Sequence, residues 1–239
     1  MDEKITKLRL DNDYTQEFVA EKLGITRQSY IQTERGTRKP TTDDIEKLAG
    51  LYGVPVEEFF YQSQNLDKFK QMYFYVLSKF APAGIPKTKL AKILYLADFY
   101  HYYEDLEPMS GVFYRRRQYG PLADVFLSLT DELYDSGKID IDYLQYAAMV
   151  KLPKISSTES NLEKSKITST SSAVKFELLT NQEKKQIDKI CEYWRERRTS
   201  EIVNFTHEQK PWMSCRDGEI IPYSLIIQEN PDHVYAPIA

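Results

Sequence analysis

A tight glycine turn near the N-terminus constrains this chain more than any other feature. Gly24 separates two short segments with helical spacing, and a threonine precedes each of them, Thr15 the first and Thr26 the second. Threonine at these positions caps a helix N-terminus, while a glycine after Leu23 ends the preceding helix in a left-handed turn. The pattern predicts two short helices joined by about three residues, which is a helix-turn-helix arrangement.

The remainder of residues 1–62 completes a small helical unit. Ile5 begins an apolar stripe before the turn, and Thr41 with Asp44 predicts a capping box for a helix that follows it. Pro55 begins a last short helix. We therefore expect residues 1–62 to form a five-helix domain in a chain that is mainly α-helical.

The segment from Thr15 to Phe60, TQEFVAEKLGITRQSYIQTERGTRKPTTDDIEKLAGLYGVPVEEFF, resembles the phage-repressor-like (XRE-type) helix-turn-helix family. In such repressors the helix after the turn lies in the DNA major groove. The resemblance places Arg27, Gln28 and Gln32 at base-contacting positions, where arginine suits guanine and glutamine suits adenine. The residues assigned to DNA binding are Gln16 (a phosphate contact), Thr26, Arg27, Gln28, Ser29, Gln32, Arg35, Arg38 and Lys39.

The resemblance also predicts which neighbouring side chains point inward. Tyr30 and Thr33 face the core, and Glu34 belongs to an internal polar pairing. Thr33 departs from the family, in which a larger aliphatic residue is usual, so we expect it to loosen the packing of this helix.

Charge leaves two interpretations of this domain open. Residues 1–62 hold 9 basic and 12 acidic side chains, which favours a degenerate domain kept as an oligomerisation scaffold. Residues 27–39, however, carry four basic side chains against Glu34 alone, and phosphate contacts depend on local charge. Sequence-specific binding to operator DNA, as a homodimer, is the interpretation we adopt.

Residues 63–239 form a second, mostly helical domain with a small antiparallel β element. Helical spacing predicts helices from about Leu66, over about 87–103, from Pro121 to Ser136, and after a capping box at Thr180. Alternation at 139–143 and again at 174–178 predicts two paired strands. Between them, residues 154–175 carry ten Ser/Thr in 22 positions and are predicted to form a mobile loop.

Three ordered motifs in this domain resemble the Panacea domain, the SocA-like antitoxin family. They are a K-L-x-K-x-L-Y-x-A-D helix at Lys89–Asp98, a Y-G-P turn at Tyr119–Pro121, and a T-H-x-x-x-x-W element at Thr206–Trp212. The resemblance covers about residues 66–225. It implies an antitoxin that neutralises a cognate toxin protein by direct binding and, with the helix-turn-helix attached, represses its own operon.

Candidate toxin contacts come from two surfaces, since Tyr and Arg are enriched at interface centres. The first is a helix face opposite the apolar stripe, and the second is a basic segment. The residues assigned are Tyr95, Asp98, Tyr102, Arg115, Arg116, Arg117 and Tyr119. The alternatives for the arginines are a solvated strand face or a second phosphate contact, and the alternative for the tyrosine face is a second packing surface.

Other motif residues are assigned structural roles. Gly120 and Pro121 are expected to set the chain path, with proline presetting φ for a helix that follows. His207 is expected to make structural hydrogen bonds and Trp212 to be a large buried ring. His101, on the apolar stripe, is interpreted as a hydrogen-bonded core histidine rather than a ligand.

Composition narrows the function further. No apolar window is long enough to span a membrane, and the N-terminus lacks the features of an export signal, so a cytoplasmic protein with no membrane partner is expected. The two cysteines, Cys191 and Cys215, and three histidines fit no zinc pattern, and no cofactor or catalytic constellation is found. We expect a self-regulating antitoxin that is not an enzyme. The alternative is a repressor whose second domain senses a ligand or acts as a protease adaptor, with no toxin.

Overall fold

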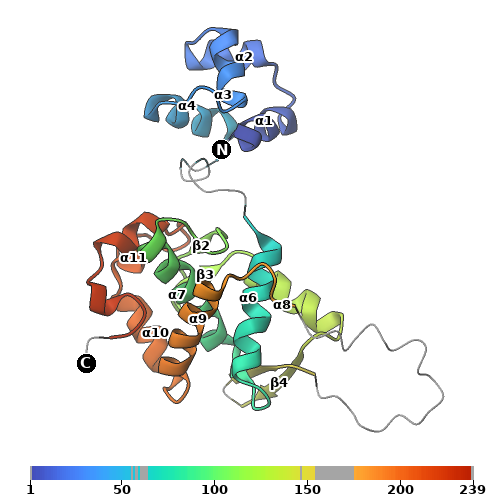
Figure 1. Ribbon diagram of the computed structural model, residues 1–239, viewed down its shortest axis with the longest axis vertical. Helices are drawn as coiled ribbons and strands as arrows, with labels where there is room; N and C mark the ends of the chain where they lie inside the picture. Colours follow the sequence, from blue (N-terminus) through green and yellow to red (C-terminus); the bar gives the residue numbers. More distant parts are fainter. Residues whose placement is uncertain are drawn as a thin grey trace, which may run out of the picture. The chain divides into compact units, whose positions relative to one another are not determined.

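The computed structural model describes residues 2–54, 56, 59, 64–145, 147–153 and 175–237, which form two units (Figure 1). The chain divides into Met1–Gln64 and Asn65–Ala239, and each unit is described by itself. Both units are built mainly from helices, as predicted. The predicted mobile loop at 154–175 lies outside the described residues except for Lys175.

The first unit follows the predicted capping pattern. Thr15 Oγ1 and Thr26 Oγ1 each accept a hydrogen bond from a backbone N–H three residues later, and Gly24 ends the helix between them with φ of 75°. Thr41 and Asp44 form the predicted capping box. The predicted fifth helix falls mostly on residues outside the described set. The described helices are α1 (Asp2–Asp11), α2 (Gln16–Leu23), α3 (Arg27–Glu34) and α4 (Thr42–Tyr52).

Buried polar pairs fix α3 within this unit. Glu34 accepts a hydrogen bond from Arg9 of α1 at 2.6 Å, so its predicted internal pairing is confirmed. Tyr30 is fully buried, and its hydroxyl lies 3.3 Å from that of Tyr52 in α4. Thr33 is also buried, and its hydroxyl donates to Ser29 O at 3.2 Å. Its hydroxyl is thus held in a local hydrogen bond, and the effect of Thr33 on the packing of this helix stays a prediction.

The second unit is organised around one buried helix. Every residue of α7 (Lys87–Asp105) from Lys89 to Phe99 is buried, and the helix contacts neighbours on all sides (Figure 1). The other described helices are α6 (Leu66–Lys79), α8 (Phe126–Asp135), α9 (Asn181–Trp194), α10 (Thr199–Glu208) and α11 (Lys210–Met213), with 3₁₀ helices η1 (Tyr223–Gln228) and η2 (Pro231–His233). Among the described residues, no helix is long and apolar enough to cross a membrane.

Two small antiparallel sheets are formed by the described residues of this unit. One has the strand order β1-β5-β4, and the other pairs β2 with β3. The strands are β1 (Ile85–Pro86), β2 (Tyr114–Arg115), β3 (Leu122–Ala123), β4 (Asp140–Leu144) and β5 (Ala147–Lys151).

The structure corrects two predicted elements. The strand at 139–143 does not pair with residues near 176–178. β4 instead forms a short hairpin with β5, and Phe176 packs edge-on against Tyr75 of α6. Pro121 does not begin a helix, because Leu122 and Ala123 pair with β2 and α8 begins only at Phe126. A strand of two residues is too short to show a periodicity of its own, so the sequence pattern did not distinguish Leu122 and Ala123 from the first turn of the helix that follows.

Two charged side chains of α7 hold distant segments from inside the core. Lys89 Nζ donates to Trp194 O at 2.8 Å and to Arg195 O at 3.1 Å, so it neutralises the C-terminal carbonyls of α9. Asp98 accepts hydrogen bonds from Ser110 N at 2.6 Å and from the Tyr114 hydroxyl at 2.9 Å. Burial raises the pKa of the Asp98 carboxyl because it disfavours the charged form, and the hydrogen bonds from Ser110 and Tyr114 oppose this effect.

Replacing Asp98 tests this arrangement. Asp98→Asn turns one acceptor into an amide donor that faces a donor of Ser110, and we expect a loss of about 1–3 kcal/mol in the free energy of unfolding. Chemical denaturation measures it, with Asp217→Asn at an exposed position as the control, for which a change within about 0.5 kcal/mol is expected. Equal stability of the two variants would contradict the role of Asp98.

Candidate DNA-binding and partner-binding sites

The predicted base-contacting residues share the exposed face of α3. Arg27, Gln28 and Gln32 are exposed, and positions 28 and 32 are one helical turn apart. The capping hydrogen bond from Ser29 N to Thr26 Oγ1 fixes the start of the helix, at which base contacts would be made.

A hydrogen-bond chain orients the start of this face. Glu34 accepts from Gln16 Nε2 at 2.8 Å, and Gln16 Oε1 accepts from Arg27 at 3.1 Å. The Arg27 guanidinium remains half exposed, 3.8 Å from the Glu17 carboxylate. Hydrogen bonds therefore connect the partly buried Arg9–Glu34 pair through Gln16 to the guanidinium of Arg27, and these bonds limit the positions that Arg27 adopts.

The basic residues after α3 divide into two kinds. Arg35 and Lys39 are exposed. Arg38 is half-buried and donates to Thr33 Oγ1 at 2.9 Å and to Asp44 at 2.7 Å, so its guanidinium holds the loop between α3 and α4. Arg38 was predicted to contact DNA, but the structure gives its side chain a role within the fold that the sequence pattern did not reveal.

In the second unit, Arg115 and Arg116 of the predicted toxin-binding segment are engaged inside the fold. Arg115 makes two hydrogen bonds to Asp124 and donates to Gly218 O at 3.0 Å. The Arg116 guanidinium lies 3.9 Å from the centre of the Trp212 ring, and its other contact is the carbonyl of Cys215. These two side chains hold the strand pair β2–β3 against the segment after α11.

The stack on Trp212 continues on its other partner, His207. The two rings lie 4.2 Å apart and are nearly parallel, with an interplanar angle of 19°. Burial and the charges of Lys92 and Arg116 lower the pKa of His207, so the imidazole is neutral at pH 7. Trp212 is half-buried rather than fully buried, so the expectation of a large buried ring is wrong. His207 was predicted to make structural hydrogen bonds, but its buried Nε2 has no hydrogen-bond partner among the described residues, and its printed contact is the ring stack on Trp212.

The tyrosine face predicted on α7 is not a surface. Tyr95 and Asp98 are fully buried, and Tyr102 is half-buried against Tyr223, with ring centres 5.6 Å apart. An aromatic run at helical spacing is a packing face here because η1 covers it. Within the predicted toxin-binding set, Arg117 and Tyr119 are the exposed members.

The turn before β3 is shaped by a buried lysine. Lys92 Nζ donates to Pro121 O at 2.6 Å, and Lys92 is 2% exposed. Gly120 has φ of +87°, and a Cβ atom there would lie 2.7 Å from Thr206 Oγ1 and 2.9 Å from Lys92 Cε. The Y-G-P motif therefore exists because only glycine fits between α7 and α10 at this turn.

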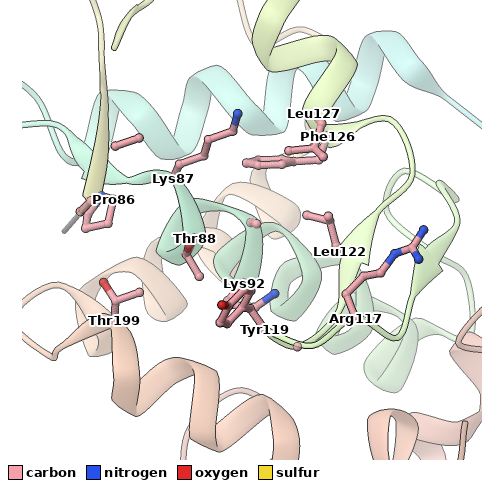
Figure 2. Close-up of a pocket in the computed structure, with 14 residues that line it drawn as sticks. Pro86, Lys87, Thr88, Lys92, Arg117, Tyr119, Leu122, Phe126, Leu127 and Thr199 are labelled. Carbon is pink, nitrogen blue, oxygen red and sulfur yellow. The ribbon is translucent and has the colours of Figure 1, made fainter. Parts of the chain in front are cut away.

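A cavity of about 440 Å³ opens beside this turn (Figure 2). Figure 2 shows Lys87 and Thr88 of α7 across it from Leu122 and Arg117. The lining is mostly apolar and includes the cations Lys87, Lys92 and Arg117, but no acidic residue. Sequence reasoning missed Lys87 and Lys92. The available signal was a lysine at position 92 between the apolar residues Ala91 and Ile93.

The remaining titratable candidates have structural environments. His101 is half-buried rather than in the apolar core, and its Nδ1 lies 2.9 Å from Gln186 Oε1 and 3.1 Å from Asp105. Cys191 and Cys215 are both buried and are not joined by a disulfide bond. Within the described ranges, no group of His, Cys, Asp and Glu side chains is arranged to hold a metal ion.

Comparisons with known proteins agree with this division. Residues 5–59 match a helix-turn-helix family model, and residues 90–213 match the model described as "Antitoxin SocA-like, Panacea domain". The chain is 41% identical over 66 residues to the cryptic phage CTXphi transcriptional repressor RstR of Vibrio cholerae, which is 27% of this chain and 60% of RstR. It is 37% identical over 60 residues, or 25% of this chain, to an uncharacterized helix-turn-helix transcriptional regulator of Methanocaldococcus jannaschii, of which it covers 91%. No solved structure matches the chain.

The exposed α3 face and these matches identify the class of protein, which is a helix-turn-helix transcriptional regulator. The second unit then gives the family, because the Panacea match spans just over half of the chain. The chain belongs to the family described as "Antitoxin SocA-like, Panacea domain".

The buried ammonium of Lys92 has a measurable effect on stability. Burial lowers the pKa of Lys92 from 10.5 to about 7, so at higher pH the folded state releases a proton that the unfolded state keeps. We expect the stability of the wild type relative to Lys92→Met to rise between pH 7 and 9 by up to about 1.4 kcal/mol per pH unit.

Denaturation curves at several pH values measure this difference. Below pH 7 the lysine is charged in both states, so the difference should become constant. Lys185→Met, at an exposed position of α9, is the control and should leave the slope unchanged. A pH-independent difference for Lys92→Met would show that the lysine keeps its proton in the fold.

Proposed function

We propose that this chain is a self-regulating antitoxin: its second unit binds and neutralises a cognate toxin protein, and its first unit represses the operon from operator DNA. The observation that carries the proposal is the presence, in one chain, of a helix-turn-helix domain and a SocA-like antitoxin domain. The proposal requires binding alone, with no catalytic step and no cofactor.

The α3 face supports the DNA-binding half. Arginine and glutamine make bidentate contacts with guanine and adenine in the major groove, and Arg27, Gln28 and Gln32 are all exposed. Arg35 and Lys39 add exposed positive charge where the chain leaves this helix, which suits a phosphate backbone. The similar RstR protein is named a transcriptional repressor. Repressors of this arrangement bind as dimers to half-sites about one helical turn apart, and we propose the same here.

The toxin-binding half rests on the family and on the site. The match over residues 90–213 is to a domain described as an antitoxin, and this stretch includes the exposed Arg117 and Tyr119. The alternative is a repressor whose second unit senses a ligand or delivers another protein to a protease. The two differ in one observable property, namely whether a neighbouring gene product is toxic without this chain.

Base reading by α3 is tested with DNA from upstream of the gene. We expect Arg27→Ala or Gln28→Ala to cost roughly 1–3 kcal/mol on the specific site and little on random DNA, since a bidentate base contact is lost. Lys39→Ala should weaken binding to all sequences and reduce the salt slope by about one.

Binding titrations at several salt concentrations separate these effects. Lys7→Ala, at an exposed position of α1, serves as the control and should bind like the wild type. Equal losses on specific and random DNA for Arg27→Ala would refute its base-reading role.

The two activities are tested together in cells. Each gene adjacent to this one is expressed alone and with the full chain, and we expect one product that stops growth only when expressed alone. Arg27→Ala should still rescue growth, and so should a fragment that begins at Asn65, because both leave the second unit intact. The same fragment should not bind the operator.

Circular dichroism of the fragment verifies that it folds. Loss of rescue by a folded fragment would show that the first unit contributes to toxin binding. If no adjacent product is toxic, the repressor without a toxin becomes the better description.

A further inference from the structure

The cavity beside the Tyr119–Gly120–Pro121 turn has an unusual balance of charge. Its lining combines Leu122, Phe126 and Leu127 with three cations, and it contains no aspartate or glutamate. Elsewhere in this unit, basic side chains are commonly paired with acidic ones, as Lys68 is with Glu183. A cavity that is apolar and positive but lacks acidic groups suits a ligand that is apolar and negative.

The three cations lie at different depths. Lys92 is buried, and the described residues give its ammonium one hydrogen-bond acceptor, Pro121 O. Lys87 is partly exposed, and its nearest acidic partner is the Asp131 carboxylate at 3.9 Å. Arg117 is exposed, and no ion pair with another described residue holds it. A carboxylate that enters the cavity would therefore meet the charge of Arg117, the ammonium of Lys87 that Asp131 partly balances, and, below about pH 7, the protonated amine of Lys92 at depth.

Two apolar residues of the lining are exposed to solvent. Tyr119 is 67% exposed and Leu127 is 49% exposed, and both belong to the lining. Neighbouring Arg115 and Arg116 are held by Asp124 and Trp212, so contacts within the fold fix both residues that precede Arg117. Rigid aromatic and arginine side chains are typical anchors of protein interfaces because little conformational entropy is lost on binding.

We propose that this cavity is the docking site for the toxin, which inserts a segment that carries a carboxylate next to an apolar side chain. The apolar side chain packs against Phe126 and Leu127, while the carboxylate faces Arg117 and Lys87. A protein occupant is favoured over a small molecule because two apolar lining residues, Tyr119 and Leu127, are themselves largely exposed to solvent. This inference rests on the proposed function, since it needs the toxin to exist.

Two charge changes test the docking site in the full chain, against the toxic gene product found by co-expression. We expect Arg117→Glu and Leu127→Glu each to weaken toxin binding by at least about 30-fold and to abolish rescue of growth. Ile227→Glu is the matched control for the second variant, since Ile227 is also 49% exposed but does not line the cavity. Lys185→Glu, at an exposed position of α9, is the control for charge reversal. Both controls should rescue like the wild type.

A compensating change identifies the charge pair. Acidic residues of the toxin are replaced one at a time by arginine, and one of these variants should bind Arg117→Glu better than it binds the wild-type chain. Thermal melts of all variants of this chain should agree with the wild type, because the substituted positions are exposed.

The outcomes distinguish the two proposals. If the wild-type chain rescues growth and the cavity variants, folded, rescue equally well, the toxin binds elsewhere and this inference is overturned while the proposed function stands. If every folded surface variant loses rescue, including the controls, the effect is not specific to the cavity and the inference is likewise overturned. If the wild-type chain rescues no adjacent gene product, the proposed function fails and the docking site fails with it.

Discussion

Burial of charged side chains on one helix determines the architecture of the second unit. Lys89, Lys92 and Asp98 of α7 all lie inside the protein, where an unpaired charge is costly. Each is therefore bonded to a segment outside α7: Lys89 to the end of α9, Lys92 to the carbonyl of Pro121, and Asp98 to Ser110 and Tyr114. The helix acts as an internal scaffold that holds these segments by polar contacts as well as by apolar packing.

The same contacts decide which motif residues are free to act. Lys92 and Gly120 fix the turn, and the Arg116–Trp212–His207 stack fixes the strand pair beside it. Three consecutive arginines therefore have two different roles, since Arg115 and Arg116 stabilise the fold and Arg117 faces outward. The three arginines are therefore not one uniform binding patch, because the fold already uses the side chains of Arg115 and Arg116.

A comparable division exists in the first unit. The buried Arg9–Glu34 pair continues through Gln16 to Arg27, so an interior ion pair positions a surface side chain. Arg38 is held by Thr33 and Asp44 and shapes the loop after α3. Exposed Gln28 and Gln32 have no such restraint in the contacts of the described residues, which leaves them available to a partner.

Local signals in the sequence were sufficient for the first unit and for the class of the whole chain. Caps such as Thr15, Thr26 and the Thr41–Asp44 box depend on a few neighbouring residues, so the helices and the exposed α3 face could be predicted from spacing. The sequence motifs of the two units were likewise sufficient to identify both families. Contacts between distant segments could not be predicted in this way, because the spacing of apolar residues along a helix does not tell whether another element covers that helix face. Tertiary structure alone decided that η1 buries the tyrosine face of α7, that β4 pairs with β5, and that Lys87, Lys92 and Arg117 gather around one cavity.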